Sequence, residues 1–310
     1  MKKNRIKNYL INNGIRFRDN SEIGEFLTMR VGGKVGFIIF IDSNRELIDL
    51  LKFLHPLEEN HILIGGGSNI IFPDQADNLI VLINNTSDIS HIDTHTLKVN
   101  SGLKNSDFLE YCKKNRIHGF EFLAGIPGTI GGATAVNAGA FGNSISENIV
   151  GGDIFSEKGN LNYTKKEFFN FRYRNSRFKY GKDIILNIYL RFECGDKTLI
   201  KKRINEIIKL RTEKHPPYST FTAGCFFKNP EVDGEKLSAG KLIESCDLRK
   251  YETKKVKMSE KHSNFLVNRG TAGFSDIEAF GKKVQETVKE KDGILLEREV
   301  IFVSPSGKKF

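Results

Sequence analysis

A long stretch with almost no charge constrains this chain more than any other feature. Residues 119–142 contain seven glycines among mostly small residues, and Glu121 is the only ionisable side chain. Backbone that closely approaches a large, flat, phosphate-bearing cofactor needs small side chains and accessible amides. A packing segment is the alternative for a shorter glycine-rich run. The sequence therefore predicts that residues 119–142 hold such a cofactor.

A second glycine cluster lies upstream, at Gly65, Gly66, Gly67, Ser68 and Asn69. It follows an apolar run that predicts a buried strand, so its backbone amides could surround a phosphate. It is not a Rossmann fingerprint, because Ile70 stands where a glycine is required, and the Gly-Lys-Ser/Thr of a P-loop is missing. From this cluster alone, a tight turn and a ligand loop both stay open.

Composition limits the class of protein. At 310 residues the chain can bury the cores of two or three domains, and four widely spaced cysteines without a CxxC pair indicate reduced thiols. No apolar run approaches the roughly 18 residues of a membrane span, and the first residues lack a signal peptide's apolar stretch. We therefore expect a cytoplasmic protein without a membrane partner. The net charge of +10 suits a polyanionic ligand without choosing among ligands.

Helix and strand patterns predict an α+β fold. Capping-box spacing marks helix starts at Ser43 with Glu46 and at Ser275 with Glu278, and more weakly at Thr164 with Glu167. A further helix is expected from about residue 199 to 213, ended by two prolines. Short β-rich runs are expected at 36–42, 61–64, 79–83, 149–155, 184–192, around Phe226, 264–268 and 294–303. The strands do not alternate regularly with long helices, which excludes a doubly wound sheet.

Six motifs, in order along nearly the whole chain, resemble those of the UDP-N-acetylenolpyruvoylglucosamine reductase family. Residues 119–142 and 63–72 resemble its two flavin-binding segments. The others are Thr28 to Gly33, Tyr173-Arg174-Asn175-Ser176, the heptapeptide Gly224 to Pro230, and Leu296-Glu297-Arg298-Glu299-Val300. The short spacing from Arg174 to Cys225 indicates the subtype that lacks a tyrosine-bearing insertion.

The resemblance implies a vanillyl-alcohol-oxidase-type (PCMH-type) FAD-binding fold and a separate substrate domain. We expect an FAD region over residues 1–198, to which residues 293–310 return, and a substrate domain over 199–292. It also implies noncovalent FAD, NADPH as co-substrate, and reduction of UDP-N-acetylglucosamine enolpyruvate to UDP-N-acetylmuramate in peptidoglycan precursor synthesis. The expected FAD contacts are Gly65, Gly66, Gly67, Ser68, Asn69, Pro127, Gly128, Thr129, Gly131, Gly132, Asn137, Ala138, Gly139 and Gly142.

Three residues match the family's catalytic positions. The reaction develops carbanion character beside a carboxylate, and Arg174 and a protonated Glu299 would stabilise that charge. We expect burial of Glu299 because Glu297 and Glu299 share a strand face with apolar Leu295 and Ile301. Cys225 stands at the proton donor's position, where serine is commoner. An unperturbed thiol has a pKa of about 8.5, so it can still deliver a proton near neutral pH.

Substrate contacts are expected at Lys214 for the diphosphate, Asn229 for the nucleotide and, more weakly, Asn264. Another FAD-dependent oxidoreductase of the same fold, acting on a different alcohol or sugar, is the alternative function. A basic nucleic-acid-binding protein is the alternative from another class, since residues 168–180 interleave aromatic and basic side chains. It leaves residues 119–142 unexplained, so we expect no nucleic-acid partner.

A metal site is not expected. His91 and His95 have the spacing of two ligands on one helix face, but the residues around them favour strand and turn, and no third ligand is apparent.

Overall fold

The computed structural model describes residues 2–310, which fold into two compact units. Unit 1 comprises the chain up to Ser21, Val35–Gly66 and Asp77–Lys209, and unit 2 comprises Glu22–Lys34, Gly67–Ala76 and Leu210–Phe310. The predicted division into residues 1–198 with 293–310 and residues 199–292 stays a prediction. Helices and strands are mixed in both units, which confirms the α+β class.

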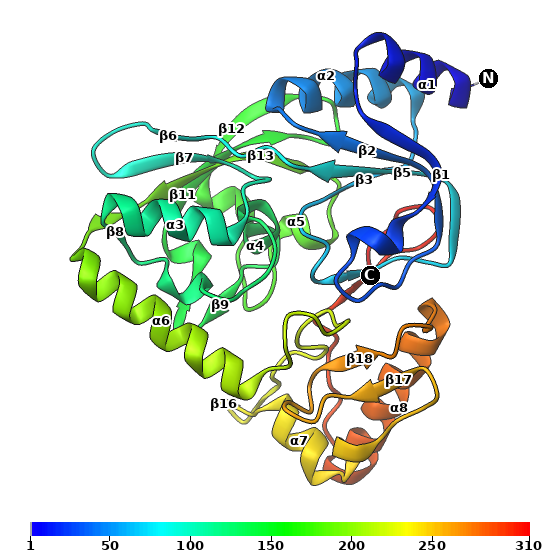
Figure 1. Ribbon diagram of the computed structural model, residues 1–310, viewed down its shortest axis with the longest axis vertical. Helices are drawn as coiled ribbons and strands as arrows, with labels where there is room; N and C mark the ends of the chain where they lie inside the picture. The colour runs from blue at the N-terminus through cyan, green and yellow to red at the C-terminus, as the bar shows by residue number, and fades with distance from the viewer. Residues whose placement is uncertain (1) are drawn as a thin grey trace. The chain divides into compact units, whose positions relative to one another are not determined.

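A four-stranded sheet with the order β1-β2-β5-β3 begins the fold. Its strands are β1 (Phe17–Glu22), β2 (Lys34–Ile41), β5 (Gln75–Asn84) and β3 (His61–Ile64), with β3 parallel to β5. Helices α1 (Lys2–Asn12) and α2 (Asn44–Leu54) lie on one face of this sheet (Figure 1). They bury Leu10 and the leucines at 47, 50, 51 and 54 against β2 and β5. Burial of this apolar stripe explains why the α2 sequence is helical here.

The larger sheet of unit 1 is antiparallel, with the order β12-β11-β13-β7-β6. Its strands are β12 (Leu161–Lys165), β11 (Ile149–Phe155), β13 (Ile184–Arg191), β7 (Thr96–Asn100) and β6 (Ile89–His91). The associated helices are α3 (Asn105–Asn115), α4 (Ile130–Ala135), α5 (Arg177–Tyr180) and α6 (Lys197–Lys214). Helix α6 contributes Ile200, Ile204 and Ile207 to the core of this unit. Two short strand pairs complete it, β8 (Ile117–His118) with β14 (Glu193–Cys194) and β9 (Gly139–Ala140) with β10 (Asn143–Ser144).

Buried asparagines connect this sheet to the glycine-rich stretch. The Asn187 side-chain oxygen accepts hydrogen bonds from the amides of Asn44 and Asn100, each at 2.7 Å. The Asn84 amide donates to the Ser101 hydroxyl at 2.8 Å, and the Ser101 carbonyl accepts the Gly131 N–H at 2.8 Å. Buried polar groups that are hydrogen-bonded in this way fix a single arrangement of the segments they join. The network therefore holds Gly131 against the end of β7.

Unit 2 is built from short elements around its own core. Strand β4 (Ile70–Ile71) is parallel to β19 (Ile301–Phe302), and β17 (Val256–Met258) is antiparallel to β18 (Leu266–Asn268). Strands β15 (Glu231–Val232) and β16 (Glu235–Lys236) form a hairpin, and the helices are α7 (Ala239–Ser245) and α8 (Phe274–Asp292). Helix α8 buries Ile277, Phe280, Val284 and Val288 in this core.

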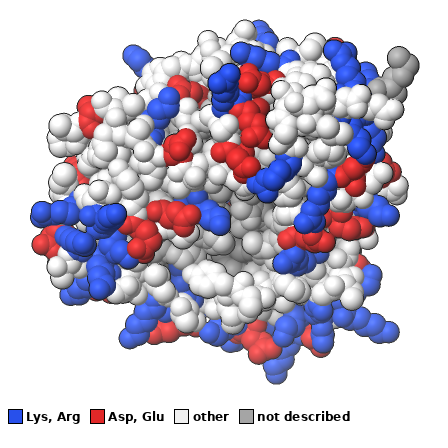
Figure 2. Space-filling view, turned by 45° about the horizontal axis from the view of Figure 1, so that its top comes forward, with Lys and Arg blue, Asp and Glu red and all other residues white. Residues whose placement is uncertain are grey.

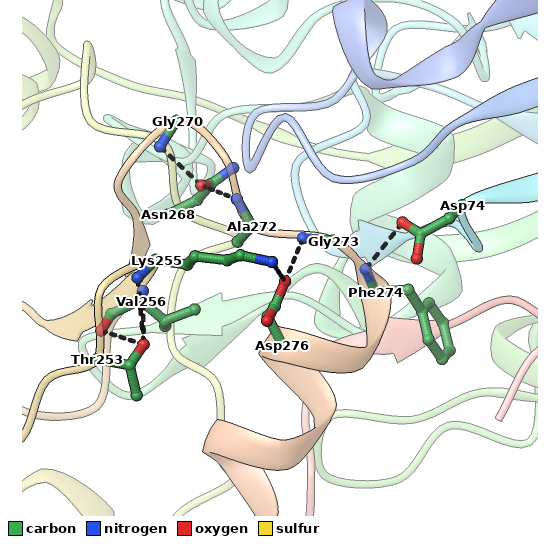
Figure 3. Close-up of polar contacts among 10 residues, drawn as sticks. All are labelled: Asp74, Thr253, Lys255, Val256, Asn268, Gly270, Ala272, Gly273, Phe274 and Asp276. Carbon is green, nitrogen blue, oxygen red and sulfur yellow. Dashed lines mark hydrogen bonds and ion pairs between the residues drawn. The ribbon is translucent and has the colours of Figure 1, made fainter.

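Helix α8 begins two residues earlier than its sequence predicts. Its cap is Gly273, whose N–H donates to the Asp276 carboxylate at 2.9 Å, and Asp276 also pairs with Lys255 (Figure 3). The next N–H, of Phe274, donates to the Asp74 carboxylate at 3.0 Å. The predicted Ser275–Glu278 box is wrong because a carboxylate from a distant segment supplies the cap.

The other predicted elements have mixed outcomes. Ser43 accepts the Glu46 N–H at 3.1 Å and begins α2 as predicted, and the expected helix at 199–213 is α6. Thr164 lies within β12 and is not a helix cap, although a 3₁₀ helix, η5 (Lys166–Phe169), begins two residues later with Lys165 as its N-cap. The run 294–303 is a regular strand only at Ile301–Phe302. Phe226 hydrogen-bonds to neighbouring segments but does not lie in a strand. Both strand predictions are therefore largely wrong. The remaining strands are confirmed to within a few residues, except that only 266–268 of 264–268 is strand.

The surface carries mixed charge. Figure 2 shows Lys and Arg interspersed with Asp and Glu over the visible face. Ion pairs such as Lys3–Asp19 and Arg16–Asp42 are exposed, as expected for solvated charges. Within residues 2–310, no helix has the length and apolar character needed to cross a membrane.

Candidate functional site

The two glycine-rich loops touch each other inside unit 1. A Cβ added to Gly65 would lie 2.2 Å from the Thr129 Oγ1, and a Cβ added to Gly66 would lie 2.7 Å from the Gly128 Cα. The first contact is with the Thr129 side chain and the second is with backbone, so position 66 in particular has no room for a side chain and requires glycine. The loops that the sequence assigns to one cofactor are therefore neighbours in the fold.

The second loop is anchored by its own hydrogen bonds. Thr129 accepts the Gly132 N–H at 3.2 Å and caps α4. The Ile130 N–H donates to the Leu103 carbonyl at 2.8 Å, and the Asn105 N–H donates to the Gly128 carbonyl at 3.0 Å. These hydrogen bonds fix the backbone of the turn around Gly128, as a preformed cofactor loop requires.

The electrostatics of the loop fit an anionic cofactor. Glu121, its one ionisable residue, is buried and its carboxylate is engaged by the Gly119 N–H at 3.0 Å and by His118 Nδ1 at 2.9 Å. The carboxylate is therefore directed into the fold and does not oppose a diphosphate. Neutral backbone at the approach of Gly66 to Gly128 fits the diphosphate of FAD.

The end of the glycine-rich stretch makes hydrogen bonds that organise the local backbone. The Asn137 amide donates to the Arg172 carbonyl at 2.9 Å, and the Ala138 carbonyl accepts the Ile145 N–H at 2.9 Å. Gly139 pairs with Ser144 in the β9–β10 hairpin. These contacts organise the segment around residues 137–145. The predicted FAD contacts of Asn137, Ala138, Gly139 and Gly142 stay predictions, as do the other assigned cofactor contacts.

Arg174 lies at the tip of a tight turn in unit 1. Arg172 and Asn175 exchange backbone hydrogen bonds at 3.0 and 3.1 Å, and Arg174 has a left-handed φ of 52°. The Ser176 hydroxyl donates to the Ala135 carbonyl at 2.7 Å. Together with the Asn137 bond to Arg172, this ties the turn to the glycine-rich stretch. The predicted carboxylate-binding arginine is thus positioned by the same segment that fits the cofactor.

Cys225 and Glu299 are brought together in unit 2. Cys225 is paired with Phe265, and the next residue, Phe226, donates its N–H to the Asn264 carbonyl at 2.7 Å. On the other side, the Phe226 carbonyl accepts the Glu299 N–H at 2.8 Å. Three segments therefore run side by side, with the thiol and the carboxylate on adjacent ones. The catalytic roles of Arg174, Cys225 and Glu299 stay predictions.

The predicted apolar face around Glu299 is partly wrong. Leu295 is 64% exposed, and the Glu297 side chain is 70% exposed, whereas Leu296 and Val300 are buried. Glu299 itself is half-buried. The alternation fails because residues before β19 do not form a regular strand.

Sequence reasoning missed Lys228, which is buried apart from its tip. Its Nζ lies 2.5 Å from the Glu297 Oε1, and its N–H donates to the Glu297 carbonyl at 2.8 Å. The residue stands inside the quoted motif Gly224 to Pro230, where a charged residue between Phe227 and Asn229 was the available signal. The pair joins the Cys225 segment to the Glu299 segment.

The expected substrate residues differ in their surroundings. Lys214 ends α6 and is exposed. The Asn229 side-chain oxygen accepts the Ala239 N–H at 3.0 Å. The buried Asn264 side chain accepts the Phe227 N–H at 2.9 Å and donates to the Phe227 carbonyl at 2.7 Å. Asn264 therefore holds the backbone beside Cys225, and all three substrate contacts stay predictions.

The aromatic and basic run 168–180 is divided between the core and the surface. Phe169 and Phe178 are buried in the core of unit 1, and the Arg177 guanidinium lies 3.7 Å from the Phe168 ring centre. Phe169 and Phe178 are thereby unavailable for stacking on bases, whereas Tyr173 and Tyr180 are exposed. His91 ends a strand rather than lying on a helix, and the described residues contain no group of three metal-ligating side chains.

Two histidines, His215 and His262, pack near Phe265, which pairs with Cys225. The His215 and His262 rings lie 5.5 Å apart, and the His215 ring lies 5.1 Å from that of Phe265, the partner of Cys225. Burial, with Arg211, His262 and Lys214 nearby, lowers the pKa of His215 to about 4. The unfolded chain therefore takes up this proton near pH 6.5, and the folded chain only near pH 4.

We predict that the free energy of unfolding falls as the pH decreases from about 6.5 to about 4. The unfolded state binds more protons in this window. The shift would correspond to about 3 kcal/mol, which we reduce to on the order of 1–2 kcal/mol because His215 is only half-buried. Urea unfolding of wild type and His215→Phe at pH 7 and 4.5 measures it. An equal loss in both proteins would exclude His215 as the cause.

The paired glycine loops and the surrounding α+β fold define a flavoprotein. An FAD-binding-domain model matches residues 36–163, and a model described as "UDP-N-acetylenolpyruvoylglucosamine reductase, C-terminal domain" matches residues 216–303. The chain belongs to the UDP-N-acetylenolpyruvoylglucosamine reductase family, which confirms the resemblance found in its motifs.

Similar proteins support this membership over nearly the whole length of the chain. The reductase of Caldicellulosiruptor bescii is 34% identical over 95% of this chain and 93% of its own length. That of Fusobacterium nucleatum is 35% identical over 92% of this chain and 98% of its own. The crystal structure of UDP-N-acetylenolpyruvylglucosamine reductase from Thermus caldophilus superposes with a TM-score of 0.76 at 25% identity, covering 93% of this chain and 98% of that one.

Proposed function

We propose that this protein reduces UDP-N-acetylglucosamine enolpyruvate to UDP-N-acetylmuramate, with FAD as bound cofactor and NADPH as reductant. The main support is that this chain is similar, over nearly the full length of both proteins, to reductases named for this substrate. Arg174 and Glu299, which match the family's residues, and Cys225 at the proton donor's position support it. The reaction would serve peptidoglycan precursor synthesis in the cytoplasm.

The residues of the chain would manage charge and protons during the reduction. FAD, when bound, supplies the hydride that adds to the vinyl C3 of the enolpyruvyl ether. The resulting carbanion character at C2 is delocalised into the adjacent carboxylate, where the Arg174 guanidinium would bind in bidentate fashion. A protonated Glu299 would donate a hydrogen bond to the same charge.

Cys225 would complete the reduction. Its thiol would give a proton to C2 and become a thiolate, which regains a proton from water. Two electrons and one proton then enter as hydride at C3, and the second proton enters at C2. A half-buried thiol suits this role, because it is shielded from bulk water but can still contact a substrate.

Separate half-reactions test this function. When NADPH is mixed anaerobically with the purified yellow protein, the visible absorbance of the oxidised flavin should be lost. Subsequent UDP-N-acetylglucosamine enolpyruvate should restore the oxidised spectrum with formation of UDP-N-acetylmuramate. UDP-N-acetylglucosamine, which lacks the vinyl group, is the matched control and should leave the flavin reduced. A flavin that stays reduced with the enolpyruvyl sugar would exclude the proposed reaction.

A further inference from the structure

The segment Thr28 to Gly33 has no role in the function described so far, although it resembles a family motif. In unit 2 its first residue makes two hydrogen bonds in different directions. The Thr28 N–H donates to the Gly67 carbonyl at 3.1 Å, and the Thr28 hydroxyl donates to the Thr222 carbonyl at 2.7 Å. Gly67 belongs to the upstream FAD loop, and Thr222 lies three residues before Cys225. Thr28 therefore contacts both a cofactor loop and the loop of the proton donor.

The contact with the cofactor loop is tight. Gly67 has a left-handed φ of 60°, and a Cβ added to it would lie 2.2 Å from the Phe26 carbonyl oxygen. The two backbones thus touch with no side chain between them. Any displacement of Gly67 must be accompanied by movement of Phe26 and the residues that follow it, because packed segments do not deform independently.

The contact with the Cys225 loop is supported from a second side. The buried Asn268 donates its amide to the Met29 carbonyl at 2.9 Å, and its N–H donates to the Phe221 carbonyl at 2.9 Å. Asn268 therefore joins the same two segments, one residue from Thr28 and one residue from Thr222. Thr28 supplies the direct hydrogen bond between those segments from its own side chain, so the bond can be removed without disturbing Asn268.

We propose that Thr28 is a positioning residue that couples the FAD loop at Gly67 to the placement of Cys225. Filling of the FAD loop fixes Gly67, and the two hydrogen bonds of Thr28 transmit that position to the Thr222 carbonyl. The loop that leads into Cys225 is then held with the thiol in its working place. The catalytic consequence rests on the proposed function, whereas the mechanical coupling does not.

Two substitutions separate the hydroxyl's role from its bulk. Thr28→Val removes the donor and keeps the shape, and Thr28→Ser keeps the donor. Thr222→Val is the matched control, because the buried Thr222 hydroxyl has no hydrogen-bond partner among the described residues while its carbonyl is retained. The control therefore removes the same group from the loop without breaking the bond from Thr28.

The direct readout is the alkylation rate of Cys225 by iodoacetamide in the apo and FAD-loaded proteins, followed by peptide mass spectrometry. A Cys194→Ser background removes the exposed thiol. We expect FAD to change the rate at least about threefold in wild type, Thr28→Ser and Thr222→Val, and less than about 1.5-fold in Thr28→Val. A misplacement near 1 Å can cost about 100-fold in rate. We therefore expect Thr28→Val to lower kcat for the sugar by about 10–100-fold, with KM and flavin reduction by NADPH within about threefold.

Three results would overturn the coupling. The first is a wild-type alkylation rate that does not respond to FAD, and the second is an unchanged response in Thr28→Val. Loss of the response in Thr222→Val would also overturn it, since packing and not the hydrogen bond would then be responsible. Because alkylation needs no sugar turnover, the result of this test can be interpreted even if the proposed reaction does not occur.

Discussion

Replacing Cys225 by alanine should separate the two half-reactions. Reduction of FAD by NADPH should stay within about twofold of wild type, because no proton donor to the sugar is needed in that step. Sugar turnover should fall by about 10²–10⁴-fold, the usual contribution of a general acid. Alanine fits the site, since Cys225 is half-buried and its segment is held by backbone contacts of its neighbours. Anaerobic stopped-flow measurement of each half-reaction provides the comparison.

Cys225→Ser is the matched control. A serine hydroxyl also carries a proton at nearly the same position, and serine is the commoner residue there in the family, so we expect turnover within about tenfold of wild type. Iodoacetamide should inactivate wild type but spare the serine variant. Equal losses in both half-reactions of Cys225→Ala would instead assign the residue a structural role.

The cofactor loops were largely predictable from sequence. Lack of charge and a high glycine content pointed to residues 119–142, and the structure shows Glu121 turned inward, as this interpretation requires. Their contact could not be predicted, because Gly66 and Gly128 are distant in sequence and no local pattern encodes their approach. The composition indicates that the backbone of each loop closely approaches another group, but only the fold shows that the two loops approach each other.

The candidate catalytic residues depended on the resemblance. Arg174 is one of four basic residues between positions 172 and 179, and periodicity does not distinguish them. In the fold it stands apart through its left-handed turn and the ties of that turn to Asn137 and Ala135. Tertiary contacts of this kind also explain the errors. The Phe274 N–H at the start of α8 donates to the distant Asp74, and the segment before β19 is held by Phe226 and Lys228 rather than by a sheet.

Gly66→Ala should nearly abolish FAD binding. The new methyl group would lie 2.7 Å from the Gly128 Cα, about 1 Å inside the distance at which carbon atoms attract, roughly 3.5–4.0 Å. Since Gly128 is fixed by the Asn105 N–H, the loops must separate. We expect the Kd for FAD to rise at least about 100-fold, equivalent to about 2.7 kcal/mol. Fluorescence titration of the apoprotein with FAD measures this change.

Gly14→Ala controls for the general cost of replacing glycine. Gly14 also has a left-handed φ, of 66°, but an added Cβ would meet nothing within 4 Å. The variant should lose about 1 kcal/mol of unfolding free energy through backbone strain and keep its FAD affinity within about twofold. Unfolding of both apoproteins in urea shows whether Gly66→Ala is still folded. A folded Gly66→Ala protein that bound FAD as tightly as wild type would mean that close approach of the two loops is not needed to hold the cofactor.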